Sequence, residues 1–550
     1  MSKLRLRRPF VAVVLVLIAS IQVAGIYRVT RGWHSDIDTS PGIDIDFGKP
    51  DVLVRTRSLS SLFRDLLKVP IARDLFQEDL AFYYEMSPGR LGLNGTVRRI
   101  AYEHNLTWTD RLVASAFNEP AEVMMWRGPK GSLDYWAIAM TRGTIATVLQ
   151  EAATSVASDT QLSRAGEIDV DGTNVPAFAL QLSPDRTLIL AAAGDRVVVL
   201  SDAGMLNGKG ESGDPREAVG KLLSADVKKR GLYDATFPAS AESNRNGEAP
   251  VHSVAARLHF ASFGYQRFFP GVEALKFDFG GGAWSTSLLL DPAAIKGATL
   301  GEGAPWTAIP ANAGLCAMLP VDWTQGSEIL ERVDGPKAIA NLAQELEGPA
   351  VVCWYADGRI HTPLIAATLK SPRADLEPLF TSLFDWSIKR GAATEAPAIA
   401  RPADGEALWQ RDLEVPYSSI DDKTGRPEPG TLKITLGAKG RYIFFSPDAT
   451  QVTRALATVA KRYPSMADVL PREGTTLGVI VPKSLSSLAR AEALVMLPPP
   501  DEPVFRAAAE RHLLPRLDRV ATYPGYRLAL PAQAGTGRHW QQVSWQELAR

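Results

Sequence analysis

The chain has 550 residues, of which 45% are hydrophobic and 22% are charged. This composition indicates a globular protein with a sizeable core, and it excludes a disordered, collagen-like or multi-span membrane chain. The formal net charge is -1, from 60 Lys and Arg against 61 Asp and Glu, so the overall charge does not favour nucleic acid as a partner.

The N-terminus combines a cationic tip with an apolar run. Four cations stand in the tip: Lys3, Arg5, Arg7 and Arg8. Residues 9–27 follow without a charged side chain. A helix of that length measures roughly 28 Å, close to the ~30 Å hydrocarbon thickness of a bilayer. We therefore expect residues 1–31 to form a cytoplasmic tip and a transmembrane anchor in the lipid bilayer; cleavage after Gly25, as in a signal peptide, is the alternative.

The charge asymmetry around this run predicts its orientation. Cations concentrate before the span, which places the N-terminus in the cytoplasm. No later apolar run approaches the ~18 residues that a second span needs. We therefore expect a single-pass protein whose bulk lies across the membrane. In a bacterium that side would be the periplasm, and a eukaryotic lumenal setting fits the same pattern equally well. Residues 32–49, which contain Pro41 and Gly42, are predicted to be a linker.

Two segments later in the chain resemble two earlier ones. Residues 192–202 parallel 438–448 as a strand, a turn and the start of a helix, and residues 120–126 parallel 349–355. The order of the matching segments is the same in both halves. The number of residues between matching positions changes along the chain, as expected where surface loops of different length are inserted. The sequence therefore predicts two copies of one unit, at 50–300 and 301–550.

Local signals within the copies predict their elements. The dipeptides Asp171-Gly172, Gly194-Asp195 and Lys439-Gly440 predict hairpin turns, because such residues supply positive φ. A helix is expected near 60–67, where a serine that can act as an N-cap precedes an apolar run. Further helices are expected at 215–223 and 450–462, because these segments are rich in alanine and leucine and each follows a predicted hairpin. Strands without strict strand-helix alternation favour an α+β class. We thus expect two tandem, pseudo-symmetric repeats with largely antiparallel sheets and packed helices.

The chain contains two cysteines, Cys316 and Cys353. An even number in an exported protein is compatible with a disulfide. Two buried free thiols in strand-like runs are an equally good interpretation. No histidine or further cysteine stands at ligand spacing, so a metal site is not expected.

Recognisable catalytic motifs are missing from the sequence. It contains no G-x-x-x-x-G-K-[ST], H-E-x-x-H, G-x-S-x-G or S-x-x-K, so we predict no catalytic, cofactor-binding or metal-binding residues. A segment of copy one combines aromatic residues with arginines, the composition of binding hot spots. Its members are Tyr83, Tyr84, Arg98, Arg99, Tyr102 and Trp108. They are candidate partner-binding residues, or else core residues of an ordinary hairpin.

Residues 55–62 and 64–70, followed by 79–85 and 98–104, resemble a bacterial family called domain of unknown function 2138. The resemblance implies a bacterial host and a membrane-anchored periplasmic protein. It also implies a genetic link to a bacterial alpha-2-macroglobulin, a protease-trapping protein. The family has no known catalytic residues, so none is carried over.

Together these features predict a non-enzymatic, inner-membrane-anchored periplasmic binding or accessory protein. The partner that the resemblance implies is an alpha-2-macroglobulin-like protease trap in envelope defence. The alternative is an envelope enzyme that acts on cell-wall peptide or glycan through an active site without a sequence signature.

Overall fold

A computed structural model covers the whole chain and describes part of it. The described residues are 40–66, 118–128, 133–141, 162–183, 186–211, 213–238, 249–261, 271–280, 282–291, 305–323, 337–372, 376, 381–382, 399–400, 407–420, 427–496, 509–531 and 537–548. The predicted anchor at 9–27 lies outside them. No helix within the described ranges is both long enough and apolar enough to cross a membrane.

The chain divides into two compact units. Unit 1 comprises Met1–Gly264 and Glu273–Leu289, and unit 2 comprises Tyr265–Val272 and Leu290–Arg550. The boundaries expected from the sequence, 50–300 and 301–550, stay a prediction.

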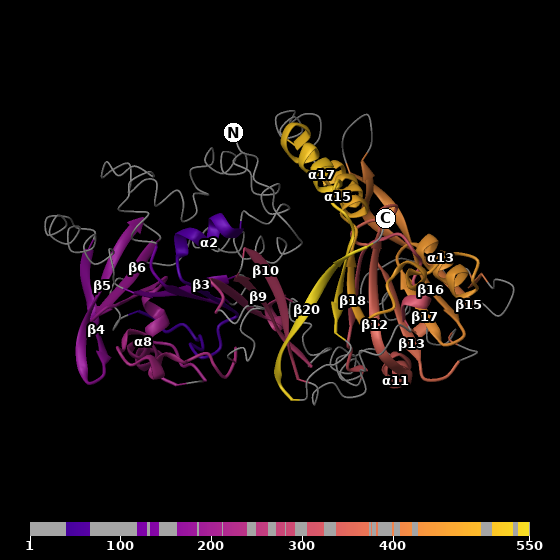
Figure 1. Cartoon of the computed structure of the whole chain (residues 1–550). Coiled ribbons are helices and arrows are strands. Elements are labelled where there is room, and N and C mark those ends of the chain that lie inside the picture. The colour runs from indigo at the N-terminus through magenta and orange to yellow at the C-terminus, as the bar shows by residue number, and fades with distance from the viewer. Residues whose placement is uncertain are drawn as a thin grey trace. The chain divides into compact units, whose positions relative to one another are not determined.

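Unit 1 is built around an antiparallel sheet (Figure 1). Its strands are β1 (Val52–Thr56), β2 (Ala121–Arg127), β3 (Leu133–Thr141), β4 (Leu162–Val170), β5 (Thr173–Ser183), β6 (Arg186–Ala193), β7 (Arg196–Leu200), β8 (His252–Arg257), β9 (Val272–Gly280) and β10 (Ala283–Leu290). They pair in the order β10-β9-β8-β1-β2-β3-β7-β6-β5-β4. In β3, buried side chains alternate with partly exposed ones along most of the strand, as expected where a sheet has two different faces.

Helices cover the sheet of unit 1 locally. They are α2 (Leu59–Leu66), η2 (Ala203–Leu206), α8 (Pro215–Leu223), η3 (Val227–Arg230) and α9 (Leu258–Ala261). Helix α8 begins where the Asp214 carboxylate accepts from the Arg216 N–H, with Pro215 at the first helical position. Its buried Val219 and Leu222 form part of the core. Gly220 lets α8 approach β4 closely, because a Cβ there would lie 2.3 Å from the Asp169 carbonyl oxygen.

The two faces at the centre of this sheet carry different elements. Val52 and Val54 of β1 lie in a buried cluster against which Leu62 of α2 packs. On the other face, the Tyr233 hydroxyl donates to Met124 Sδ of β2 at 3.0 Å. Successive residues of β1 therefore point alternately towards α2 and towards the segment that contains Tyr233.

Unit 2 repeats the same strand order. Its strands are β11 (Ala313–Leu319), β12 (Leu346–Tyr355), β13 (Leu364–Leu369), β14 (Ile399–Ala400), β15 (Ala407–Ile420), β16 (Pro427–Lys439), β17 (Tyr442–Ser446), β18 (Thr475–Ile480), β19 (Tyr526–Leu530) and β20 (His539–Glu547). They pair in the order β20-β19-β18-β11-β12-β13-β17-β16-β15-β14. Each strand thus takes the place of the strand numbered ten lower in unit 1.

The described helices of unit 2, apart from α15, have fewer residues than its longest strands, β15 and β16. They are η5 (Pro305–Thr307), α11 (Lys337–Glu345), α13 (Ala449–Val459), α14 (Met466–Val469), α15 (Pro482–Met496), η6 (Ala509–Leu513) and α17 (Leu514–Val520). Helix α13 follows the β16–β17 hairpin as α8 follows β6–β7 and η2. It begins with the Asp448 carboxylate accepting from the Thr450 N–H.

Several local predictions are confirmed. The predicted turns contain Gly194 at φ +56° and Gly440 at φ +59°. The helix expected at 215–223 is α8, and the one expected at 450–462 is α13. Capping residues and turn glycines act through neighbouring backbone atoms, so they can be recognised in sequence.

The expected fold class is wrong. The described part of the chain is mostly antiparallel sheet with few helices, so it is not an α+β protein with packed helices, and it contains no membrane-spanning helix. In unit 2, strands β15 and β16, with 14 and 13 residues, form one long antiparallel hairpin. The Ala- and Leu-rich segments at 215–223 and 450–462 each give a single helix, α8 and α13, that packs on the sheet.

Candidate functional site

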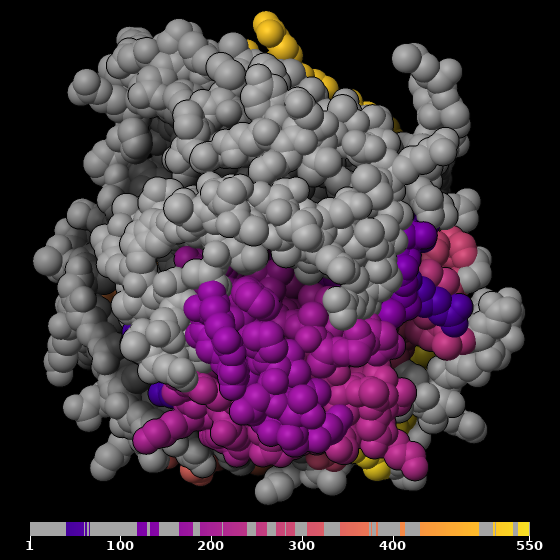
Figure 2. Space-filling view, turned by 90° about the vertical axis from the view of Figure 1, so that its left-hand side faces the viewer, coloured from indigo at the N-terminus to yellow at the C-terminus, as the bar shows by residue number. Residues whose placement is uncertain are grey.

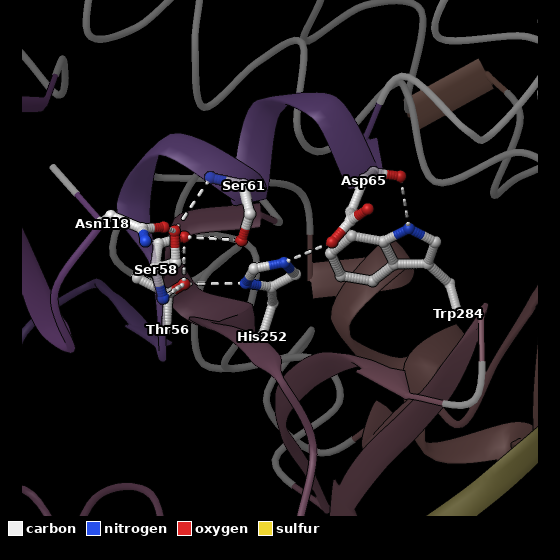
Figure 3. Close-up of polar contacts among 7 residues, drawn as sticks. All are labelled: Thr56, Ser58, Ser61, Asp65, Asn118, His252 and Trp284. Carbon is white, nitrogen blue, oxygen red and sulfur yellow. Dashed lines mark hydrogen bonds and ion pairs between the residues drawn. The ribbon is translucent and has the colours of Figure 1, made fainter. Parts of the chain in front are cut away.

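The described residues of unit 1 include a polar cluster with a buried centre, which we call the His252 cluster (Figure 3). Its members are Thr56, Ser58, Ser61, Asp65, Asn118, His252 and Trp284. They come from β1, the start and body of α2, the residues before β2, and strands β8 and β10.

Sheet register and helix periodicity bring these residues together. Thr56 of β1 lies directly opposite His252 of β8, so the hydroxyl and the imidazole share one face of the sheet. Helix α2 begins three residues after Thr56 and runs over the same face. Ser61 and Asp65 are four residues apart on α2 and therefore lie on one side of it.

The start of α2 is fixed by short side-chain contacts. Ser58 Oγ accepts from the Ser61 N–H at 3.2 Å and donates to Asn118 Oδ1 at 2.6 Å. Thr56 Oγ1 accepts from the Ser58 N–H at 3.0 Å. These contacts satisfy amide groups that the helix cannot pair itself, so β1 and α2 meet at a defined angle.

The imidazole of His252 is completely buried and contacts a polar group on each side. Its Nδ1 lies 2.7 Å from Thr56 Oγ1, and its Nε2 lies 3.0 Å from Asp65 Oδ2. The ring stacks on Phe279, with centroids 5.6 Å apart, and on Trp284 at 6.3 Å. Trp284 Nε1 in turn donates to the Asp65 carbonyl oxygen at 3.4 Å.

Counting protons assigns a state to the ring. The single hydroxyl hydrogen of Thr56 is directed to the Ser58 carbonyl oxygen, 2.8 Å away. Thr56 Oγ1 can then only accept from His252, so Nδ1 carries a hydrogen. Its other nitrogen, Nε2, then faces the Asp65 carboxyl group, so both ring nitrogens of the buried imidazole have a polar partner.

A hydroxyl, an imidazole and a carboxylate in line are the components of an activated nucleophile. Here, however, Thr56 is 6% exposed and its hydroxyl is bonded to the Ser58 backbone in both directions. The arrangement holds α2 on the sheet, and it offers no free base or nucleophile.

In unit 2 the structure brings Cys316 and Cys353 together in a disulfide. The residues lie directly opposite each other on β11 and β12, with Cα atoms 4.2 Å apart. This spacing is close to that of directly opposed residues without mutual hydrogen bonds in antiparallel strands. Both side chains are buried, at 2% and 0% exposure, so the bond lies inside the core.

The other predicted site residues lie outside the described residues. They are Tyr83, Tyr84, Arg98, Arg99, Tyr102 and Trp108. Within the described part, no group of three His, Cys, Asp or Glu side chains is arranged to hold a metal ion.

Sequence reasoning did not find the His252 cluster. His252 is 187 residues from Asp65, and the pair forms only because β8 returns beside β1. The only local signal is the Thr-x-Ser pattern at Thr56 and Ser58 with Asp65 further along α2, which predicts a capped helix and says nothing about histidine.

Comparison with known proteins gives two matches. The family described as "Uncharacterized protein conserved in bacteria (DUF2138)" matches residues 8–547. "Uncharacterized protein YfaA" of Escherichia coli (strain K12) is 31% identical over 525 residues, which cover 92% of this chain and 91% of that protein. No solved structure matches the chain.

Proposed function

The chain belongs to the DUF2138 family of proteins conserved in bacteria, and from this premise we propose that it is a binding protein of the bacterial cell envelope. In this proposal residues 9–27 hold it in the inner membrane and the two units lie in the periplasm. It acts by binding another envelope protein, without catalysis.

The main observation that supports the proposed periplasmic location is the Cys316–Cys353 disulfide. Both cysteines of the chain are used in it. Disulfides persist in the periplasm and are rare in the bacterial cytosol, where thiols are kept reduced. The cationic and apolar N-terminal sequence supports the same location.

The His252 cluster supports binding over catalysis. It is the arrangement among the described residues that comes closest to a catalytic one, yet its imidazole is wholly buried. The hydroxyl beside it, that of Thr56, is also buried and is bonded to the Ser58 backbone. A group that already bonds its neighbours and does not meet solvent cannot easily attack a substrate.

The partner we propose is an alpha-2-macroglobulin-like protease trap of the envelope. This choice follows from the genetic link to such a protein that the family resemblance implies. A membrane-held accessory protein would keep such a trap beside the inner membrane.

Location is tested with two reporters fused after Arg550 of the full-length chain. Alkaline phosphatase folds only where its disulfides form, and a fluorescent protein that matures only in the cytosol serves as its counterpart. The proposal predicts phosphatase activity without fluorescence. Fluorescence without phosphatase activity would contradict it.

Binding is tested by affinity capture of the tagged full-length chain from crosslinked membranes. A variant that retains only residues 1–39 is the control. The proposal predicts that a protease trap is enriched with the full chain and not with the control. Capture without such a protein would contradict the proposed partner.

The enzyme alternative is tested by assaying the full-length chain on cell-wall peptide and glycan, beside the Thr56→Val variant. We expect no turnover by either protein. Turnover by the wild type that Thr56→Val abolishes, with unchanged folding, would establish the alternative.

A further inference from the structure

The Cys316–Cys353 disulfide lies in the interior of the unit 2 sheet. Strand β11, which carries Cys316, is paired with β12 on one side and with β18 on the other. Strand β12, which carries Cys353, is paired with β11 and β13. Neither cysteine therefore stands on an edge strand, where a second molecule could approach the bond from the side.

Strand register shows what covers the bond. Val351 is two residues before Cys353 and lies on the same face of the sheet. From Val351, directly opposed residues on β13, β17 and β16 continue that face to Gly437. A Cβ built on Gly437 would lie 2.6 Å from Val452 Cγ1 of α13. Helix α13 therefore packs on the face that holds the disulfide (Figure 1).

The residues beside the two cysteines are apolar and closed to solvent. Leu364 lies opposite Cys353 on β13, and Val479 lies opposite Cys316 on β18. Both side chains, like those of the cysteines, are buried. A thiol or disulfide reagent must contact a sulfur atom directly, because exchange passes through a mixed disulfide. The buried sulfur atoms of folded unit 2 cannot be reached in this way.

Unit 1 shows that the equivalent strands can pair without such a bond. Leu53 and Met124 take the places of Cys316 and Cys353 there, and both side chains are buried. If unit 2 folded in the same way before oxidation, its two thiols would be enclosed in the reduced state. The order of oxidation and folding therefore decides whether the bond forms.

We propose that the Cys316–Cys353 bond is made on the unfolded chain, by thiol–disulfide exchange with a dithiol oxidase of the cell envelope, and that folding of unit 2 then encloses it. This inference rests on the proposed periplasmic location, because disulfides form and persist on that side of the inner membrane. It adds that the chain crosses the membrane before unit 2 folds. It also means that the bond is not a reversible redox switch in the folded protein.

The exchange has two steps. The thiolate of one cysteine attacks the oxidase disulfide, which forms a mixed disulfide and releases one oxidase thiolate. The thiolate of the second cysteine then attacks the chain's own sulfur atom in the mixed disulfide, which closes the Cys316–Cys353 bond and releases the oxidase as a dithiol. Two electrons pass from the chain to the oxidase, and the two protons lost by the cysteines balance those that the oxidase takes up. The cysteines are 37 residues apart in sequence, so they can meet in the unfolded chain at a modest entropic cost.

Access to the bond is tested on the purified, oxidised full-length chain in detergent. Dithiothreitol is added with and without guanidinium chloride, and free thiols are counted over time by maleimide labelling. We expect reduction to be at least about 30-fold slower without denaturant, because the reagent can act only when unit 2 opens. A smaller difference would overturn the proposal.

The control is a disulfide at an exposed site of the same protein. Val227, in η3 of unit 1, is 71% exposed. Figure 2 shows part of the described surface of this unit, with purple strand residues beside magenta residues that follow them in the chain. A Val227→Cys variant that also carries Cys316→Ala and Cys353→Ala is joined to glutathione through its new thiol. The ratio of its reduction rates with and without denaturant corrects for effects of denaturant on the reagent itself.

The order of oxidation and folding is tested in growing cells. The chain is pulse-labelled, and parallel samples are quenched with acid or treated with protease at intervals, to follow the disulfide and the protease resistance of unit 2. We expect the disulfide to appear first, and to form at least about tenfold more slowly in cells without envelope dithiol oxidases. Protease resistance that precedes the bond, or an unchanged rate in those cells, would overturn the inference and leave the proposed location intact. Cysteines that stay reduced would contradict the proposed location itself.

Discussion

The two units share one strand order but fill its centre with different chemistry. In unit 1, Leu53 lies opposite Met124 on the central strands, and both side chains are buried. In unit 2, the same positions hold Cys316 and Cys353, which are covalently joined. The sheet can therefore be stabilised at this point either by packing or by a crosslink.

A second pair of matching positions, in β9 and β19, holds a buried cation in both units. Lys276 in β9 forms an ion pair with Asp278 at 2.8 Å. Arg527 stands at the matching place in β19 and is 1% exposed. Its guanidinium donates to neutral oxygens, among them the Pro471 and Glu473 carbonyls at 2.8 and 2.7 Å. The shared strand order is therefore compatible with two ways of stabilising a buried cation: an ion pair in unit 1 and hydrogen bonds to uncharged oxygens in unit 2.

The largest expected effect is in unit 1. Asp65→Ala removes the carboxyl partner of the buried His252 imidazole and leaves a gap beside it, which should cost about 3–5 kcal/mol of unit 1 stability. Hydrogen exchange measured by mass spectrometry would show faster exchange of β1 and β8 amides with unit 2 unchanged. Asp234→Ala, at an exposed carboxylate, is the control, and we expect it to change stability by less than about 1 kcal/mol. Equal effects of the two substitutions would mean that the His252 pair does not stabilise α2 on the sheet.

Loss of the disulfide should lower the stability of unit 2 and leave that of unit 1 unchanged. Replacing both Cys316 and Cys353 by alanine should lower the stability of unit 2 by about 2–4 kcal/mol, since the bond restricts the unfolded chain between them. Exchange of β11 and β12 amides is the measurement, with the β1 and β2 amides as an internal reference. An equal loss of stability in unit 1 would contradict this prediction.

The pair of Arg359 and Glu492 offers a smaller test within unit 2. Arg359 Nε donates to Glu492 Oε1 at 2.7 Å, and the Ile360 N–H donates to the same oxygen at 3.0 Å. Burial raises the pKa of Glu492, but these hydrogen bonds and the nearby positive charges outweigh it and hold the pKa below its usual range. Glu492→Gln should cost about 1.5–3 kcal/mol at neutral pH, because it weakens charge-assisted hydrogen bonds.

The same residue predicts a pH dependence. Because the pKa of Glu492 is lower in the folded state, its contribution is present above the unfolded value of about 4.3 and is lost as the pH falls through the folded value. Denaturant unfolding of the wild type between pH 6 and pH 3 should therefore show a loss of unit 2 stability that is smaller in Glu492→Gln. Parallel pH profiles for the two proteins would exclude this contribution.

The smallest expected effect is that of replacing a turn glycine by alanine, and it should be equal in the two units. Gly194 and Gly440 have matching positive φ values, and a Cβ built on either meets no atom within 4 Å. Alanine at each position should thus cost only the backbone strain, about 1 kcal/mol. Unfolding curves of the two single variants check this, and a difference of more than about 1 kcal/mol would show that the two turns are not equivalent.

The contrast between these residues also explains what the sequence could predict. Gly194 and Gly440 act on adjacent backbone, so their turns were correctly predicted. The His252–Asp65 pair depends on the register between β1 and β8, which no local pattern encodes. The predicted fold class was wrong because Ala- and Leu-rich stretches suggested packed helices, whereas the described part of each unit is mostly antiparallel sheet, with the long β15–β16 hairpin in unit 2.

The central claim, that this protein works on the oxidising side of the membrane, is tested most directly by the state of Cys316 and Cys353 in growing cells. Cells are quenched with acid, the protein is denatured, and free thiols are labelled with a maleimide polymer that retards the chain on a gel. The account predicts no labelling before reduction and two labels after it. Two labels without prior reduction would show that the cysteines are free thiols in the cell and would contradict the proposed location.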